Sequence, residues 1–95
     1  MTGSTKAVRL RITGSVQGVG YRIWAKRMAL SLGLRGWVRN RTDGSVEALV
    51  IGSPEDVAAM VEASREGPAG AWVVEVTATP DADDGSVGFV ALPTE

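Results

Sequence analysis

The 95-residue sequence contains neither cysteine nor histidine. Without cysteine, the chain cannot form a disulfide, a thiolate metal site or a cysteine nucleophile. Without histidine, it has no imidazole base, no phosphohistidine and no imidazole metal ligand. These absences exclude most common hydrolytic groups, and we expect no metal and no cofactor. The lack of disulfides suits the cytoplasm, so we expect a cytoplasmic protein.

Long apolar runs are also missing. No segment approaches the roughly 18–20 apolar residues that a membrane-spanning helix needs, so we expect no membrane partner. Residues 1–6 are polar and lack the apolar segment of a signal peptide, and we interpret them as a flexible N-terminal tail. Residues 7–95 have the length and composition of one globular domain, with 44% hydrophobic and 22% charged residues in the whole chain.

Acidic residues are absent from the first 42 positions. Nine of the ten Lys and Arg residues lie within residues 1–41, and all 11 acidic residues lie from Asp43 onward. Either the two halves neutralise each other in the fold, which the charges alone slightly favour, or the basic half attracts an anion. Nucleic acid is the least favoured partner, because the overall balance is acidic and no exposed aromatic residues are interleaved on a predicted sheet face.

Periodic apolar residues predict five strands and two helices. Alternation, as in Val8, Leu10 and Ile12, indicates a half-buried strand, whereas apolar residues four apart, as in Trp24 and Met28, indicate a helix with one inward face. The order β-α-β-β-α-β, with an extra short strand, predicts the α+β class: a ferredoxin-like α/β sandwich with an antiparallel sheet and two helices on one face. The predicted strands are Ala7–Thr13, Arg35–Arg41, Ser45–Gly52, Trp72–Thr79 and Val87–Leu92, and the predicted helices run from Arg22 to Leu32 and from Ser53 to Gly67-Pro68.

Local signals refine these elements. Asp43-Gly44 predicts a hairpin turn, because glycine tolerates positive φ. Ser53 is expected to cap the second helix, with Asp56 completing a capping box. On the first helix, we expect Ile23 and Ala29 beside the inward row.

The three tryptophans are Trp24, Trp37 and Trp72. We expect them to pack within the protein rather than hold substrate, although Trp37 could flank a site. In the fourth predicted strand, alternation places Trp72 and Val74 on the same side as Val76.

Glycine is abundant where the first strand meets the first helix, in Gly14-Ser15-Val16-Gln17-Gly18-Val19-Gly20-Tyr21-Arg22. Such a loop lets successive N–H groups converge on an anion at the positive end of a helix. Arg22 at the helix start opposes the helix dipole unless an anion lies between them. A tight connection that merely uses glycine remains an equal alternative. The spacing fits neither Walker A nor the dinucleotide fingerprint, whose third glycine would fall on Ile23.

Asn40 lies at the end of the strand before the predicted hairpin turn. Its amide can donate and accept hydrogen bonds at once, which suits holding a water molecule against a substrate. An asparagine that bonds its own backbone in the turn is the commoner alternative.

Two segments together resemble the signatures of the acylphosphatase family. The first is the glycine-rich segment ending in Arg22, and the second is Gly36-Trp37-Val38-Arg39-Asn40 followed by Gly44, Val46 and Gly52. The likeness extends from about Val8 to Phe89. Tyr21 stands where the family more often has Phe. Gly20 stands where some members have a bulkier residue, and we expect this glycine to loosen the loop.

The resemblance implies the same fold and hydrolysis of an acyl phosphate to a carboxylate and inorganic phosphate. It assigns catalysis to Arg22, which grips the phosphate, and to Asn40, which orients water. We expect a monomer that binds a small acyl phosphate and neither nucleic acid nor membrane. A non-catalytic anion-binding or regulatory module of the same fold is the alternative. The phosphate-binding residues implied are Ser15, Val16, Gln17, Gly18, Val19, Gly20, Tyr21 and Arg22.

Overall fold

The computed structural model describes residues 4–95. Of the predicted tail, residues 1–3 lie outside the described part, and the first strand begins at Lys6, one residue before the predicted start. No helix in the described part is long and apolar enough to cross a membrane. In chain order the elements are β1 (Lys6–Ser15), α1 (Tyr21–Ser31), β2 (Arg35–Asn40), β3 (Val46–Gly52), α2 (Pro54–Glu66), β4 (Trp72–Pro80) and β5 (Phe89–Ala91).

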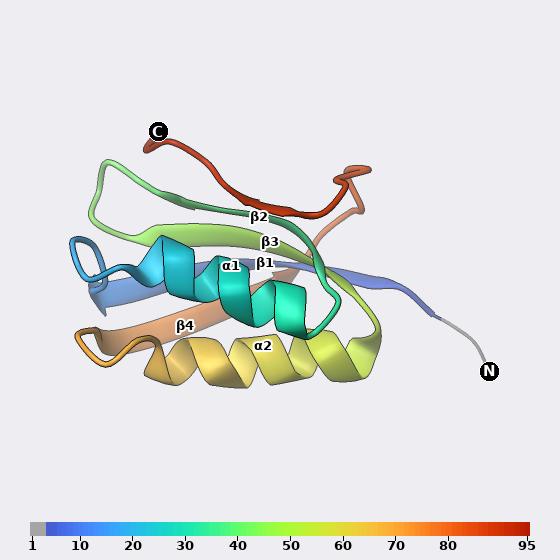
Figure 1. The fold of residues 1–95 in the computed structure, drawn as a ribbon, viewed down its shortest axis with the longest axis horizontal. Helices are drawn as coiled ribbons and strands as arrows, with labels where there is room; N and C mark the ends of the chain where they lie inside the picture. The colour runs from blue at the N-terminus through green and yellow to red at the C-terminus, as the bar shows by residue number, and fades with distance from the viewer. Residues whose placement is uncertain (1–3) are drawn as a thin grey trace.

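The five strands form one sheet in the order β4-β1-β3-β2-β5. Both helices cover the same face, and the other face is open (Figure 1). This architecture confirms the predicted ferredoxin-like α+β fold. The sheet is mixed rather than purely antiparallel, because the short β5 runs parallel to β2, with Gly36 beside Phe89 and Val38 beside Ala91.

The main core lies between the sheet and the two helices. Leu10, Ile12 and Val38 from the strands meet Ala29 of α1 and Met60 of α2, and all five are buried. The predicted inward row of α1 is only partly correct, because Trp24 and Met28 are partly buried against the core rather than at its centre. Ile23 is 59% exposed, and the fully buried residues of the helix are Tyr21, Ala25 and Ala29.

A bulge in β4 overturns the predicted faces of that strand. Thr13 pairs with Glu75 but Gly14 pairs with Val73, so Val74 is an extra residue in the ladder. Trp72 and Val74 are therefore 74% and 71% exposed instead of sharing the buried side of Val76. The expectation that Trp72 packs inside is wrong.

The predicted turn and cap are present. The turn closes with a 3.1 Å hydrogen bond from the Gly44 N–H to the Arg41 carbonyl, and Gly44 has φ 94°. Ser53 Oγ accepts from the Asp56 N–H at 3.2 Å and caps α2. The capping box is incomplete, because the Asp56 carboxylate receives the Ser53 hydroxyl rather than the Ser53 N–H.

The segment 81–88 connects β4 at one sheet edge to β5 at the other. It is fastened to side chains of the open face: Arg9 donates to Asp81 at 2.7 Å, and the Trp37 indole donates to Asp84 at 3.2 Å. Arg35 forms an ion pair with Asp83. The basic half of the chain thus partly neutralises the acidic half, as the charge distribution slightly favoured.

Candidate active site

The loop between β1 and α1 meets the β2–β3 hairpin at one end of the sheet (Figure 1). We call residues 16–20 the glycine loop. Together with the start of α1 and Asn40, it encloses a pocket of about 150 Å³. The pocket brings together most of the predicted site, but Ser15 and Val19 do not line it. The lining residues are Val16, Gln17, Gly18, Gly20, Tyr21, Arg22, Ile23 and Asn40.

The backbone of this region offers a run of unpaired donors. Within residues 4–95, no N–H from Gln17 to Ile23 has a hydrogen-bond acceptor, and the first helical bond of α1 is that from the Trp24 N–H to the Gly20 carbonyl, at 3.0 Å. Gly18 and Gly20 have φ 76° and 78°, the left-handed conformation that glycine adopts without strain. No side chain caps α1 and its first turn has no acidic residue. This end of the helix is therefore suited to an anion.

Arg22 projects from the first turn of α1 into the pocket. Its Nη1 donates to the Leu92 carbonyl at 3.0 Å, while its other guanidinium donors have no partner among residues 4–95. Leu92 is itself fixed, because its N–H donates to the Val38 carbonyl of β2 at 2.8 Å. The chain after β5 thus orients the guanidinium and leaves most of its donors free for a ligand.

Asn40 ends β2 on the strand face that points toward the helices, the same face as Val38. The Glu95 N–H donates to its carbonyl at 3.0 Å. Its side-chain amide forms no hydrogen bond with any residue from 4 to 95. The local alternative, an asparagine that bonds its own turn, is therefore absent here, and the amide is available to the pocket.

Gln17 links the glycine loop to the hairpin. Its Nε2 donates to the Arg41 carbonyl at 2.8 Å and to the Ser45 carbonyl at 2.9 Å. The sequence indicated Gln17 only as one loop residue among several. Its side-chain contacts join positions 24 and 28 residues away, and no local pattern encodes such contacts.

Trp37 does not flank this pocket. It points to the open face of the sheet, where two guanidinium groups lie near its ring, that of Arg9 at 5.4 Å and that of Arg39 at 4.8 Å from the ring centroid. Trp37 therefore packs on the face opposite Asn40.

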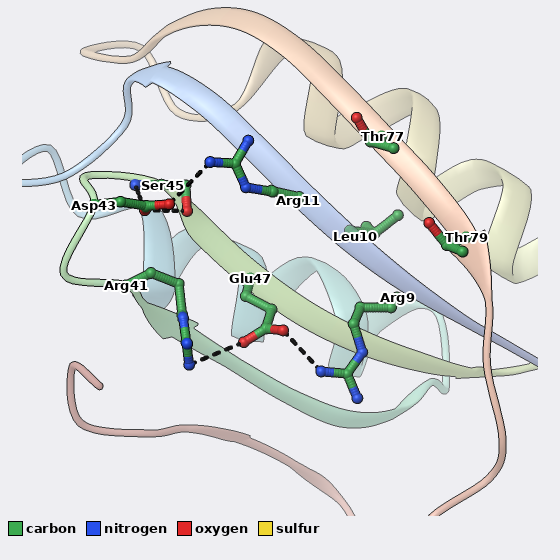
Figure 2. Close-up of a pocket in the computed structure, with 9 residues that line it drawn as sticks. All are labelled: Arg9, Leu10, Arg11, Arg41, Asp43, Ser45, Glu47, Thr77 and Thr79. Atoms are coloured by element: carbon green, nitrogen blue, oxygen red, sulfur yellow. Dashed lines mark hydrogen bonds and ion pairs between the residues drawn. The ribbon is translucent and has the colours of Figure 1, made fainter.

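A larger hollow, about 390 Å³, lies on the open face (Figure 2). Its charged groups form ion pairs with one another. The Glu47 carboxylate accepts a hydrogen bond from Arg9 at 2.7 Å and lies 3.5 Å from the Arg41 guanidinium. Burial alone raises the pKa of Glu47, but hydrogen bonds from Arg9 and Arg39 outweigh it, and the pKa lies below its usual value.

Asp43 closes the same hollow beside the hairpin turn. It accepts from the Ser45 hydroxyl at 2.6 Å, from the Ser45 N–H at 2.9 Å and from Arg11 at 2.9 Å. These bonds hold the pKa of Asp43 well below its usual range. Each guanidinium group there faces a carboxylate, so the charges of the hollow are balanced, whereas Arg22 has no carboxylate partner within residues 4–95.

Comparison with known proteins decides the family. The acylphosphatase family model matches residues 8–91. The chain belongs to the acylphosphatase family. An acylphosphatase of Bradyrhizobium diazoefficiens is 51% identical over 97 residues, covering 96% of this chain and 98% of that protein. One from Rhizobium etli is 55% identical over 73 residues, covering 77% and 78%.

Solved structures agree. The crystal structure of an acylphosphatase from Bacillus subtilis has a TM-score of 0.89 with 32% identity, covering 94% of this chain and 99% of that one. The predicted resemblance is confirmed, and the protein is an acylphosphatase that hydrolyses acyl phosphates. The effect of Gly20 on the stiffness of the loop stays a prediction. Gly20 adopts a left-handed conformation that a bulkier residue occupies only at a cost.

Proposed function

We propose that the pocket formed by the glycine loop, Arg22 and Asn40 is the site of acyl phosphate hydrolysis. The unpaired N–H groups from Gln17 to Ile23 and the guanidinium of Arg22 bind the phosphoryl oxygens. The amide of Asn40 orients the attacking water. The observation that supports this most directly is that free backbone donors, a partly free guanidinium and a free amide share one pocket of about 150 Å³.

The chemistry needs little else. Water attacks phosphorus in line as the bond between phosphorus and the carboxylate oxygen breaks, which gives a carboxylate and inorganic phosphate. A carboxylate is a good leaving group and needs no strong acid. No acidic side chain of residues 4–95 lines the pocket, so we assign the water proton to an oxygen of the substrate's own phosphate.

The test is hydrolysis of acetyl phosphate by the wild type and by Arg22→Ala and Asn40→Ala. Each substitution is expected to lower kcat/KM by roughly 10²–10³-fold, because a preorganised group is removed from the developing charge or from the water. Arg27→Ala is the matched control, since it removes the same charge from the same helix outside the pocket. Full activity in Arg22→Ala would overturn the assignment.

We also propose that the enzyme acts as a cytoplasmic monomer whose partners include no nucleic acid. Ion pairs occupy Arg9, Arg11, Arg35 and Arg39, which argues against a free basic surface. We assign catalysis to residues 7–95 and expect deletion of residues 1–5 to leave kcat/KM unchanged. Sedimentation of the protein alone tests whether it is a monomer, and sedimentation with RNA tests whether it binds nucleic acid.

A further inference from the structure

We infer that Gln17 is a positioning residue, which holds the hairpin carrying Asn40 at a fixed place relative to the glycine loop. The inference rests on the proposed roles of Arg22 and Asn40. Gln17 belongs to the glycine loop, lines the pocket, and its side chain bonds to the hairpin.

The two hydrogen bonds of the Gln17 amide link the two arms of the hairpin, and we call this pair of bonds the brace. The two acceptors, the carbonyl oxygens of Arg41 and Ser45, lie on opposite arms of the turn, and the Arg41 N–H also donates to the Ser45 carbonyl at 2.8 Å. One amide group thus spans both arms. Because both partners are acceptors, the NH₂ side of the Gln17 amide must face them.

Asn40 depends on this brace. It directly precedes Arg41, and its side chain has no partner among residues 4–95, so its position follows from the backbone of the hairpin. Within the described residues, the two bonds of Gln17 are the only hydrogen bonds between the glycine loop and residues 40–45. Loss of the brace would let the water-orienting amide move relative to the bound phosphate.

A direct contact between Gln17 and phosphate is disfavoured by the same bonds. Both Nε2 hydrogens are engaged, which leaves Oε1 as the only free polar atom of the side chain. A carbonyl oxygen is an acceptor and cannot bind an unprotonated phosphate oxygen. Gln17 therefore contributes its backbone N–H to the phosphate and its side chain to the hairpin.

A double-mutant cycle with acetyl phosphate tests the inference. Gln17→Met keeps the length of the side chain without the donors, and it is expected to lower kcat by roughly 10- to 100-fold through misplacement of the amide. KM and competitive inhibition by inorganic phosphate should stay within about twofold. In the Asn40→Ala background, the same substitution should change kcat by less than about twofold, because no amide remains to be positioned.

Additive effects of the two substitutions would overturn the inference, as would phosphate inhibition that weakens in step with kcat. Gln17→Asn retains the amide on a shorter side chain that cannot span both carbonyls, and it is expected to behave like Gln17→Met. It serves as the second variant if Gln17→Met fails to fold. Retained activity in Asn40→Ala alone would instead reject the proposed function, so the two failures are distinguishable.

Discussion

The phenol hydroxyl of Tyr21 donates a 2.7 Å hydrogen bond to the carbonyl oxygen of Ser64. Tyr21 is the first residue of α1, and Ser64 lies in the last turn of α2, where carbonyl groups lack helical partners. The ring is 2% exposed and meets Trp24 edge-on at 5.3 Å between centroids. A Cβ on Gly67 would lie 2.7 Å from it. The end of the glycine loop is thereby anchored to the second helix.

Replacing Tyr21 with Phe keeps the ring and removes the hydroxyl. We expect the free energy of unfolding to fall by about 1–3 kcal/mol, because the buried Ser64 carbonyl loses its partner. Activity at saturating substrate should change little, since the backbone of the loop is still held by the ring. Urea unfolding and kcat at pH 7 measure both effects. An unchanged unfolding midpoint would contradict the structural role of the hydroxyl.

Because of the same hydroxyl, we expect the folded protein to lose stability at alkaline pH. Burial raises the pKa of Tyr21 from its usual 10.0 to about 12, although the bond to Ser64 opposes the shift. A pKa that is higher in the folded state gives stability that is complete below pH 10 and is lost as the pH rises toward 12. The contribution is about 2–3 kcal/mol. Tyr21→Phe lacks the titrating hydroxyl. The difference in free energy of unfolding between the wild type and this variant should therefore decline from pH 10 to pH 12.

Gly20→Ala tests the conformation of the glycine loop. At φ 78° a Cβ meets no atom within 4 Å, so its cost is backbone strain of about 1–2 kcal/mol rather than a clash. We expect lower kcat/KM, since relief of the strain turns the adjacent N–H groups away from the pocket. Gly70→Ala is the control, because Gly70 has no positive φ and its nearest neighbour would be 3.6 Å away. Equal activity in both variants would count against a need for the left-handed conformation at position 20.

Glu47→Gln tests the ion-pair cluster on the open face. The carboxylate is 16% exposed and accepts from Arg9 and Arg39 at 2.7 and 2.9 Å. We expect a loss of about 1–3 kcal/mol in urea unfolding, with KM unchanged because the pocket lies on the other face. Glu62→Gln breaks an exposed pair with Arg65 and should cost less than about 0.5 kcal/mol. Similar losses in the two variants would reject a special role for Glu47.

Local patterns were sufficient for most of the fold. Alternation in β1, four-residue spacing in α1 and the Asp43-Gly44 turn depend on neighbours in sequence, and each predicted element is present. The faces of β4 were mispredicted because Val73, Val74 and Val76 allow two alternations, and the choice depends on the bulge opposite Gly14. The chain there approaches too closely for a side chain, since a Cβ on Gly14 would lie 2.2 Å from the Trp72 carbonyl.

The residues of the candidate site were predictable where they depend on residue type, and not where they depend on backbone groups far away in the sequence. Arg22 and Asn40 carry functional groups that the sequence displays, and both line the pocket. The Leu92 carbonyl that orients Arg22 is a group that every residue possesses, so no pattern distinguishes it. The exposure of Ile23 follows from how α1 lies on the sheet, with Tyr21, Ala25 and Ala29 inward.

The bond between Arg22 and the Leu92 carbonyl joins residues 70 positions apart, and the Glu95 N–H reaches back to Asn40. Contacts of such long sequence separation form late, because the intervening chain must first be ordered. On the ribosome, the loop and the hairpin emerge well before residues 92–95. The guanidinium and the amide therefore gain their final supports only once the last strand has docked. Hydrolytic activity during refolding should accordingly report completion of the fold rather than early formation of its helices.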